Sequence, residues 1–314
     1  MGSSETTIPS GRAGPSPLIA VVGDAALDVY LLVENLVGPD EKITATDGAR
    51  ALGGTGANAA AAVVRLGGRA RLHAVLGRDG AGEWIWQQIA ATGVDTGGLQ
   101  RVAGRSTIAV IVTADGHRTV IVDRGVADDV ARIEVPSITR GASLIYLSAV
   151  PVGLAAAVLT AAHVPVVVGI EARQAEEFAA LAGRKRLATL LGRAAATLTN
   201  AAGADALAGV GALTTSDGLR SAALVTTRGA AGSTLQLPGK PTLVVPAPVV
   251  QAIDPTGAGD CFAGAFCHFL SNGSSLERAT QLATIAGSLA TTKLGAQASL
   301  PTEREVLAVV AGQR

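Results

Sequence analysis

Seven residues near the carboxyl end of the chain, Asp254-Pro-Thr-Gly-Ala-Gly-Asp260, have the composition of an anion-binding turn that carries an acid or base. Gly257 and Gly259 permit a tight turn into the stretch CFAGAFCHFL, a predicted helix. The first N–H groups of a helix have no partner within it and, with the helix dipole, attract an anion such as a phosphoryl group. Asp260 can then accept a proton from an attacking hydroxyl group. The residues alone leave equal room for a structural turn with a capping aspartate.

A second glycine-rich segment, Leu52-Gly-Gly-Thr-Gly-Ala-Asn58, precedes the Ala-rich stretch AAAAVVRLGG. Its glycines let the backbone approach a ligand closely, and Asn58 offers a donor and an acceptor where the predicted helix begins. Such a loop suits the hydroxyl groups of a sugar. It also matches the GxGxxA pattern of dinucleotide-binding loops. We disfavour that alternative because the preceding TATDGARA is no buried strand, and the acid at the required distance, Asp79, lies in a glycine-rich loop.

The elements that must position these segments alternate between strand and helix. The run LIAVVGDAALDVYL opens with an apolar stretch typical of a strand buried on both faces, and places Asp28 just beyond its carboxyl end. Ligands of such a sheet bind beyond the carboxyl ends of its strands. The sequence predicts strands at about 71–77, 143–149, 165–170, 195–199 and 223–229, and helices at about 57–66, 82–94, 153–163, 175–191, 258–270, 276–292 and after Pro301.

Residues 105–124 have a different pattern. Two β-branched runs, STIAVIVT and HRTVIVDR, flank Ala114-Asp115-Gly116, which predicts an antiparallel hairpin. With the strand-like KITATDGARAL at 42–52 it predicts a small β flap outside the main sheet, and 235–250 has the short pieces of an antiparallel edge. The predicted fold is α/β: a doubly wound, mostly parallel sheet flanked by helices over residues 18–314, with flap segments at about 30–52 and 104–124.

The composition excludes several classes of function. Lys plus Arg equals Asp plus Glu at 25 each, so no net charge attracts nucleic acid or an anionic membrane, and aromatics at 3% leave few platforms for bases. The two cysteines, Cys261 and Cys267, have neither redox nor zinc spacing, and the four histidines lie far apart. We therefore expect no transition metal and a reducing cytoplasm.

Two further segments have a composition that bears on targeting or membrane insertion. Residues 1–17 are polar and rich in Gly, Ser and Pro, which predicts a disordered tail without a signal peptide. Residues 141–170 contain no charged side chain, but Pro151, Gly153 and Pro165 divide them into strand, helix and strand. We expect a buried βαβ unit rather than a membrane span.

Both glycine-rich segments, in this order and about 200 residues apart, resemble the two signatures of the PfkB carbohydrate kinase family, also called the ribokinase family. GGxGxNxA before a long helix, GRDGAGEWI after the next strand, DPTGAGDxFxGA and the late KLGAQASLP recur at the family's spacing, and the resemblance covers nearly all of residues 18–304. The chain contains no Walker A, HRD or DFG element, which argues against P-loop and protein kinases.

The resemblance implies a role for each matching position, with ATP, Mg²⁺ and K⁺ as cofactors. Asp260 resembles the catalytic base, and Asp28 resembles the acid that holds substrate hydroxyl groups. The flap becomes a substrate lid that also forms a homodimer interface. The implied sets are an anion hole of Gly257, Ala258 and Gly259; a sugar loop of Gly53, Gly54 and Asn58; nucleotide contacts at Asn200, Thr227 and Gly229; and a monovalent-cation site at Asp254, Thr256, Ala290, Lys293, Gly295 and Ser299.

Taken singly, several of these residues also have ordinary structural roles. Asp28 suits a helix or turn cap, Asn200 suits the end of a strand, and Thr227 suits the interior of one. Their functional roles rest on the resemblance.

The chain departs from the family pattern at four positions. The acid of the NxxE motif, which helps to organise magnesium and phosphate, is replaced by Gly203, so we expect weakened metal use. Gly169 stands where many members have Asp or Asn. Thr55 replaces the lysine of ribokinases and Ser148 their glutamate, which disfavours ribose.

The resulting prediction is an ATP-dependent kinase for a hydroxymethyl group on a small sugar or sugar derivative. A nucleoside kinase of the adenosine or pseudouridine type is the first alternative, because its substrates end in the same ribose hydroxymethyl group. A ligand-binding member that has lost efficient turnover is the second, favoured by Gly203 and disfavoured by the intact Asp254–Asp260 segment. Lys42, Arg105 and Arg124 of the flap suit either an acidic or phosphorylated substrate or solvent.

Overall fold

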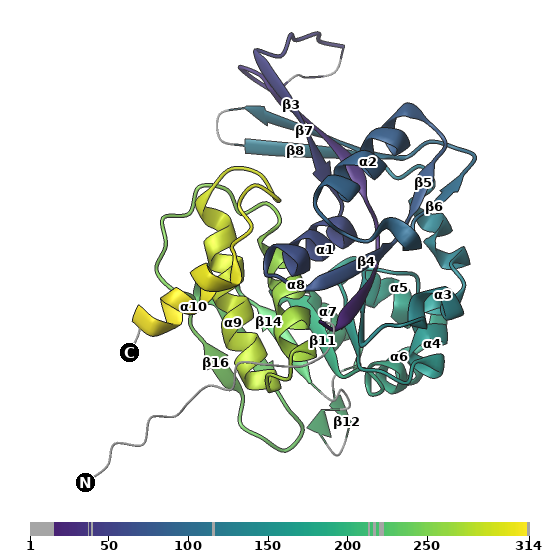
Figure 1. Cartoon of the computed structure of the whole chain (residues 1–314), viewed down its shortest axis with the longest axis vertical. Coiled ribbons are helices and arrows are strands. Elements are labelled where there is room, and N and C mark those ends of the chain that lie inside the picture. Colours follow the sequence, from purple (N-terminus) through teal and green to yellow (C-terminus); the bar gives the residue numbers. More distant parts are fainter. Residues whose placement is uncertain are drawn as a thin grey trace.

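The computed structural model describes residues 16–36, 38, 40–114, 117–212, 214–215, 218–219 and 223–312. The predicted tail at 1–17 lies almost wholly outside them. An eight-stranded sheet forms the centre of the described chain (Figure 1), in the order β16-β15-β14-β11-β10-β9-β1-β4. The strands from β14 to β4 pair in parallel, and β15 and β16 add an antiparallel edge. The bounds are β1 Leu18–Val22, β4 Arg69–His73, β9 Leu144–Ser148, β10 Val166–Gly169, β11 Ala196–Asn200, β14 Leu224–Thr227, β15 Ser233–Gln236 and β16 Leu243–Val245.

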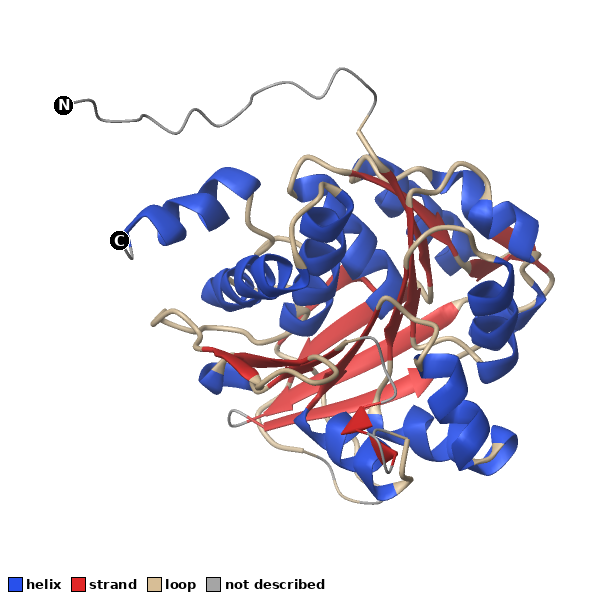
Figure 2. Cartoon of the chain, turned by 90° about the horizontal axis from the view of Figure 1, so that it is seen from below, coloured by secondary structure: helices blue, strands red, loops and turns tan. Residues whose placement is uncertain are grey.

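Strand β1 shows why the central strands are apolar throughout. Ile19 and Val21 point into one buried cluster, with residues of α1, α2, α8 and α9, and the alternate residues Ala20 and Val22 point into another, with residues of α3 to α7. Figure 2 shows helices on both sides of the sheet. The helices are α1 Thr55–Arg65, α2 Gly80–Ala91, α3 Val135–Thr139, α4 Val152–Ala161, α5 Ala172–Ala182, α6 Arg184–Leu191, α7 Ala201–Gly209, α8 Ala258–Ser271, α9 Leu276–Leu289 and α10 Glu303–Gly312.

The order of strands reverses at β1. From β1 the chain moves outward to β4, and it then returns to β9 on the other side of β1 before continuing to β10, β11 and β14. Ligands of doubly wound sheets bind at such a reversal, beyond the carboxyl ends of the strands. Asp24 follows β1 there, and Ser148 ends β9. The structure corrects the position expected for Asp28, which lies not at this edge but within β2 Ala26–Leu32.

Four strands form a second sheet, which we call the lid sheet, with the order β3-β2-β7-β8. Figure 1 shows it at the top of the molecule, projecting from the helices that cover the main sheet. The predicted hairpin is confirmed, since β7 and β8 pair antiparallel. β2 pairs antiparallel with β3 and parallel with β7. The remaining bounds are β3 Asp47–Gly53, β7 Thr107–Ala114 and β8 His117–Asp123.

Two predicted elements are wrong in their extent. The helix expected at 175–191 is two helices, α5 and α6, because Gly183 between them has a φ of 77°, which a helix cannot contain. The strand expected at 71–77 is also divided, into β4 and β5 Val75–Gly77, and β5 pairs with β6 Gln100–Val102 in a separate small sheet. Two-residue strands β12 Thr214–Thr215 and β13 Gly218–Leu219 complete the described strands. None of the described helices has both the length and the apolar character needed to cross a bilayer.

Candidate active site

The two glycine-rich segments meet because α1 packs directly against α8. Gly264 permits the close approach, since a Cβ there would lie 2.5 Å from the Ala59 carbonyl oxygen. At the start of this contact Asn58 Nδ2 donates a hydrogen bond to Asp260 Oδ2 (2.9 Å), and Gln297 Nε2 donates to Asn58 Oδ1 (3.1 Å). The structure thus joins residues 202 positions apart in the sequence and fixes both ends of the Asn58 amide.

Asp260 lies half-buried in the first turn of α8. Burial disfavours its charged form and raises its pKa to about 7, and the charges of Asp24, Glu171 and Asp28 act in the same direction. The hydrogen bond from Asn58 opposes this shift. A carboxylate with a pKa near neutrality is suited to remove a proton from an alcohol and to release it again.

The loop before Asp260 leaves the start of α8 open to an anion. Gly257 is the N-cap residue with φ 76°, and no side chain caps the N–H groups of the first turn. A Cβ at this position would lie 2.6 Å from Ala296 Cβ, so only glycine fits both the backbone and the space. Ala258 and Gly259 follow at the start of the helix. We call residues 254–259 the anion loop.

The predicted nucleotide residues line cavities on either side of the anion loop. Thr227 and Gly229 line a mostly apolar cavity of about 570 Å³ together with Ala258 and Gly259. A smaller cavity of about 120 Å³ is lined by Asn200, Thr227, Gly259 and Asp260. Thr227 and Gly259 border both, so the two cavities meet beside Asp260. Asn200 also accepts a hydrogen bond from Gly203 N (2.8 Å) as the N-cap of α7, so it has a structural role as well as a place in the cavity wall.

Two residues of the predicted cation site, Thr256 and Gly295, are hydrogen-bonded to Asp254. Its two carboxylate oxygens accept hydrogen bonds from Thr256 N and Gly295 N, both at 2.9 Å. Burial would raise the pKa of Asp254, but these hydrogen bonds outweigh it and lower the pKa. Ser299 is buried, and its Oγ has no hydrogen-bond partner among the described residues. An unpaired buried oxygen fits a cation ligand, because a bound ion would satisfy it.

Two other members of this predicted set differ in what they present. The Lys293 side chain is exposed and Ala290 has no polar side chain, so both can offer only backbone carbonyl groups. Backbone oxygen atoms are suitable ligands for such an ion.

The predicted substrate acid, Asp28, faces the glycine loop across the lid sheet. Its carboxylate occupies the space beside Gly53, where any Cβ would overlap it. Asp28 is half-buried, and burial with the nearby charge of Asp24 raises its pKa to about 6. Gly54 follows with φ 93° and forms the N-cap of α1. The sugar-loop residues therefore lie between the lid sheet and Asp260.

Asp24 was not predicted as a site residue. Thr55 Oγ1 donates to its Oδ1 (2.9 Å), Gly56 N donates to the same oxygen (3.3 Å), and Ser148 Oγ donates to Thr55 Oγ1 (2.8 Å). Thr55 and Ser148, noted in the sequence only as replacements, thus form one chain that ends on a carboxylate. The signal was present, because Asp24 directly follows the apolar run of β1, where a doubly wound sheet binds ligands.

Three more residues of the site were not predicted from the sequence, although one of them, Glu171, follows the predicted strand at 165–170 and so carried the same signal as Asp24. Gln297 fixes Asn58, and Glu171 lines the smaller cavity with Asp260. Arg118 of the lid strand β8 donates from Nη1 to Thr256 Oγ1 (2.9 Å), so the lid contacts the anion loop. Gln297 and Arg118 lie far in the sequence from the residues that they contact, which is why no local pattern reveals them.

Comparison with known proteins agrees with this geometry. Residues 16–303 match the model of the family described as pfkB family carbohydrate kinase. Ribokinase of Bacillus subtilis is 27% identical over 296 residues, which cover 92% of this chain and 97% of that protein. The bifunctional protein HldE of Caulobacter vibrioides is 33% identical over 308 residues, covering 90% of this chain but only 62% of HldE, so the chain spans less than two thirds of that relative.

The fold is shared with solved kinase structures. Arabidopsis thaliana ribokinase, solved with ribose and ATP, superposes with a TM-score of 0.76 at 25% identity, covering 95% of this chain and 99% of that one. With the family match over most of its length, the fold and the paired glycine-rich segments, this chain belongs to the pfkB family of carbohydrate kinases.

Proposed function

We propose that the protein transfers the γ-phosphoryl group of ATP to a hydroxymethyl group of a small sugar or sugar derivative. The observation that carries this proposal is the position of the Asp260 carboxylate, beside the uncapped start of α8 and at the junction of the two cavities. Asp260 takes the proton of the acceptor's hydroxyl group while the oxygen of that hydroxyl group forms a bond to the γ-phosphorus. The bond from that phosphorus to the β-phosphate oxygen breaks, and ADP leaves.

The remaining groups bind and orient the reactants. ATP occupies the larger cavity, which carries Thr227 and Gly229. The N–H groups of Gly257 and Gly259 in the anion loop stabilise the transferred phosphoryl group. Asp28 and the backbone at Gly53 and Gly54 hold hydroxyl groups of the acceptor. Asn58 orients Asp260 through their hydrogen bond.

The direct test is ADP release by the purified protein with a panel of sugars, polyols, sugar acids, sugar phosphates and nucleosides. We expect acceptor-dependent release, with several acceptors preferred over free ribose because Thr55 and Ser148 present uncharged groups. If no acceptor in the panel stimulates ADP release, the result would count against the proposal. Turnover of adenosine or pseudouridine above every sugar would favour the nucleoside kinase alternative.

The position of Gly203 suggests how the missing acid affects magnesium. A Cβ there would overlap the Thr199 hydroxyl group, which donates to Ile170 O at 2.7 Å, so a larger residue displaces Thr199. We therefore compare Thr199→Ala with Thr199→Ala/Gly203→Glu, in which the glutamate has room. We expect the double variant to reach half-maximal activity at about tenfold lower free Mg²⁺, the scale typical of outer ligand partners. If the double variant bound Mg²⁺ no more tightly than Thr199→Ala, the role of the missing acid would be assigned to Glu171, which lines the same cavity as Asp260.

Potassium is expected to activate the enzyme. Its proposed ligands include Ser299 Oγ, which is buried and unpaired among the described residues, and Asp254 holds the anion loop through Thr256 N. We expect turnover to fall when K⁺ is replaced by tetramethylammonium at equal ionic strength, and Ser299→Ala to require more K⁺ than the unmodified chain. Activity independent of K⁺ would remove this site from the proposal.

We also propose a homodimer through the lid sheet. The edge strand β8 is exposed along its length, including Val120, Ile121 and Val122 at 46%, 62% and 51% exposure. An open strand edge with apolar side chains favours pairing with another chain. We expect light scattering to give twice the chain mass and Ile121→Lys to reduce it to the monomer. A monomeric unmodified protein would contradict this.

A further inference from the structure

The hydroxyl group of Tyr146 occupies the space in which residue 169 would have its side chain. Tyr146 lies in β9, and Gly169 ends the neighbouring strand β10, in register with Ser148. A Cβ on residue 169 would lie 2.5 Å from Tyr146 Oη, which is too close for a carbon and an oxygen that are not bonded. The glycine at 169, a departure from the family pattern, therefore makes room for this tyrosine.

Tyr146 presents its hydroxyl group to the reaction site. Tyr146 and Gly169 both line the smaller cavity, whose walls also include Ser148, Glu171 and Asp260. The rest of the tyrosine side chain is buried. Burial raises the pKa of the phenol group above its usual range, and the charges of Asp260 and Glu171 act in the same direction. Tyr146 is therefore a neutral hydroxyl group in the same cavity wall as the proposed base.

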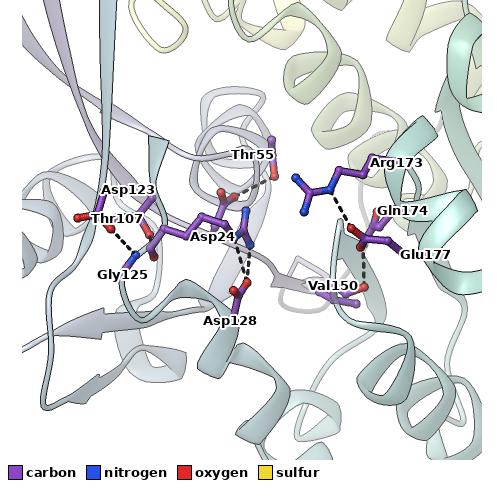
Figure 3. Close-up of polar contacts among 11 residues, drawn as sticks. Asp24, Thr55, Thr107, Asp123, Gly125, Asp128, Val150, Arg173, Gln174 and Glu177 are labelled. Carbon is purple, nitrogen blue, oxygen red and sulfur yellow. Dashed lines mark hydrogen bonds and ion pairs between the residues drawn. The ribbon is translucent and has the colours of Figure 1, made fainter. Parts of the chain in front are cut away.

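Three hydroxyl groups form a chain from Tyr146 to Asp24. Thr55 Oγ1 donates to Asp24 Oδ1 at 2.9 Å (Figure 3), and Ser148 Oγ donates to Thr55 Oγ1 at 2.8 Å. The hydroxyl group of Tyr146 is hydrogen-bonded to Ser148 in turn. Each hydroxyl group has one proton, and the Asp24 carboxylate can only accept. Every proton in the chain therefore points toward Asp24.

This direction determines what Tyr146 can offer to a ligand. Its proton is used in the hydrogen bond to Ser148, whereas the lone pairs of its oxygen remain available in the cavity wall. An oxygen that can only accept does not bind a phosphate oxygen, which also only accepts. The group that pairs with Tyr146 Oη must be a donor, as a hydroxyl group of the acceptor is.

We infer that Tyr146 Oη accepts a hydrogen bond from a second hydroxyl group of the acceptor, on the carbon next to the reacting hydroxymethyl group. The inference rests on the proposed kinase function and names its substrate class, which is acceptors with a free vicinal hydroxyl group at the reacting end. The smaller cavity has a volume of about 120 Å³, so it admits only that end of a sugar. Asp260 takes the proton of the reacting hydroxyl group, and the hydroxyl group that meets Tyr146 in the same small space is the adjacent one.

The inference distinguishes open-chain acceptors from rings. In an open-chain polyol the carbon next to the terminal hydroxymethyl group carries a free hydroxyl group. In a furanose or pyranose ring closed through that carbon, as in the ribose of a nucleoside, the same oxygen is an ether and has no proton to donate. Such a ring leaves Tyr146 Oη unpaired, and a site built to pair with a hydroxyl group discriminates against ligands that lack it.

Two matched pairs of acceptors test the inference. D-glucitol is compared with 1,5-anhydro-D-glucitol, and D-ribitol with 1,4-anhydro-D-ribitol. In each pair the free hydroxyl group next to the hydroxymethyl group becomes a ring ether. We expect kcat/KM for at least one polyol to exceed that of its anhydro partner by about tenfold or more. Anhydro compounds that are used as well as both polyols would overturn the inference while leaving the kinase function intact.

A variant then assigns the preference to one oxygen atom. Tyr146→Phe keeps the ring and removes Oη, and it should lower the polyol-to-anhydro ratio of kcat/KM by about tenfold, mainly through KM of the polyol. Thr280→Val is the control, because it removes a buried hydroxyl group that donates to Leu276 O (2.7 Å) and lines neither cavity. An unchanged ratio in Tyr146→Phe, or an equal fall in the control, would overturn the inference.

Gly169→Ala gives a second and independent test. Its methyl group displaces Tyr146 Oη, so this variant should lower the polyol-to-anhydro ratio as Tyr146→Phe does. When Oη is absent, the nearest atoms to the new Cβ are Cζ and Cε2 of the ring, at 3.2 and 3.3 Å, which a small shift relieves. Adding Gly169→Ala to Tyr146→Phe should therefore leave the ratio where Tyr146→Phe puts it. Additive losses would mean that the two residues act separately, against the inference.

A binding measurement separates this inference from the kinase proposal. If no acceptor is phosphorylated, the kinase proposal fails, and calorimetric titration with D-glucitol and D-ribitol in the presence of ADP still tests Tyr146. Polyol binding that is about tenfold weaker in Tyr146→Phe and unchanged in Thr280→Val supports the inference. Absence of binding by both polyols, or equal binding by Tyr146→Phe and the unmodified chain, overturns it.

Discussion

Asp260→Asn is expected to lower kcat by about a hundredfold or more while the fold stays intact, the usual scale for loss of a positioned general base. Asparagine keeps the size of the side chain and can still pair with Asn58, but it cannot accept the proton of the acceptor hydroxyl group. KM for ATP should change little, because the larger cavity is formed by other residues. The measurement is steady-state kinetics with the best acceptor, with circular dichroism to verify folding.

The same assignment predicts the pH dependence. A base must be unprotonated, and the pKa of Asp260 is raised to about 7, so kcat/KM should rise with pH through neutrality and then level off. Asn58→Ala removes a hydrogen bond that favours the charged form, which should move this acid limb to higher pH. If Asp260→Asn kept near-complete turnover, Asp260 would be a helix cap and not the base.

The sequence predicted the chemistry of the two glycine-rich segments better than the contacts between them. Asp260 and Asn58 were each recognisable from the glycines around them. Their hydrogen bond follows from the packing of α1 on α8, which Gly264 permits and no local pattern reveals. Gln297, which completes the arrangement, lies 239 residues from Asn58 and carries no signal of its own.

Periodicity likewise predicted the order of elements but not their breaks. Apolar runs marked β1, β9 and β10 because both faces of these strands are buried. The run at 175–191 gave no sign that Gly183 would take a positive φ, since a glycine in a helical pattern is tolerated in some helices and ends others. Asp28 was misplaced at the end of the first strand for a related reason, because the apolar stretch continues from the main sheet into the lid sheet.

Asp28→Ala is expected to raise KM for the acceptor and to lower kcat/KM by about ten- to a hundredfold. The Asp28 carboxylate packs against Gly53 and occupies the space that a Cβ on that residue would fill, so this packing fixes its position. A half-buried carboxylate discriminates between acceptors, because one that lacks the right hydroxyl groups leaves it unpaired, at a cost of about 1 to 3 kcal/mol. KM for ATP should stay nearly constant, since Asp28 does not line the larger cavity, where we place ATP.

A control and a pH measurement sharpen this second expectation. Asp47→Ala removes an exposed carboxylate from the same lid sheet, whose hydrogen bond among the described residues comes from the adjacent Gly48 N, and should leave acceptor kinetics unaltered. Burial and the charge of Asp24 raise the pKa of Asp28 to about 6, so protonation below that pH removes its capacity to accept two hydrogen bonds, and KM for the acceptor should rise as the pH falls. Asp28→Ala should abolish that part of the rise while the dependence of kcat on Asp260 persists. If Asp28→Ala proved as harmless as Asp47→Ala, the acceptor would have to bind elsewhere than between the lid sheet and the sugar loop.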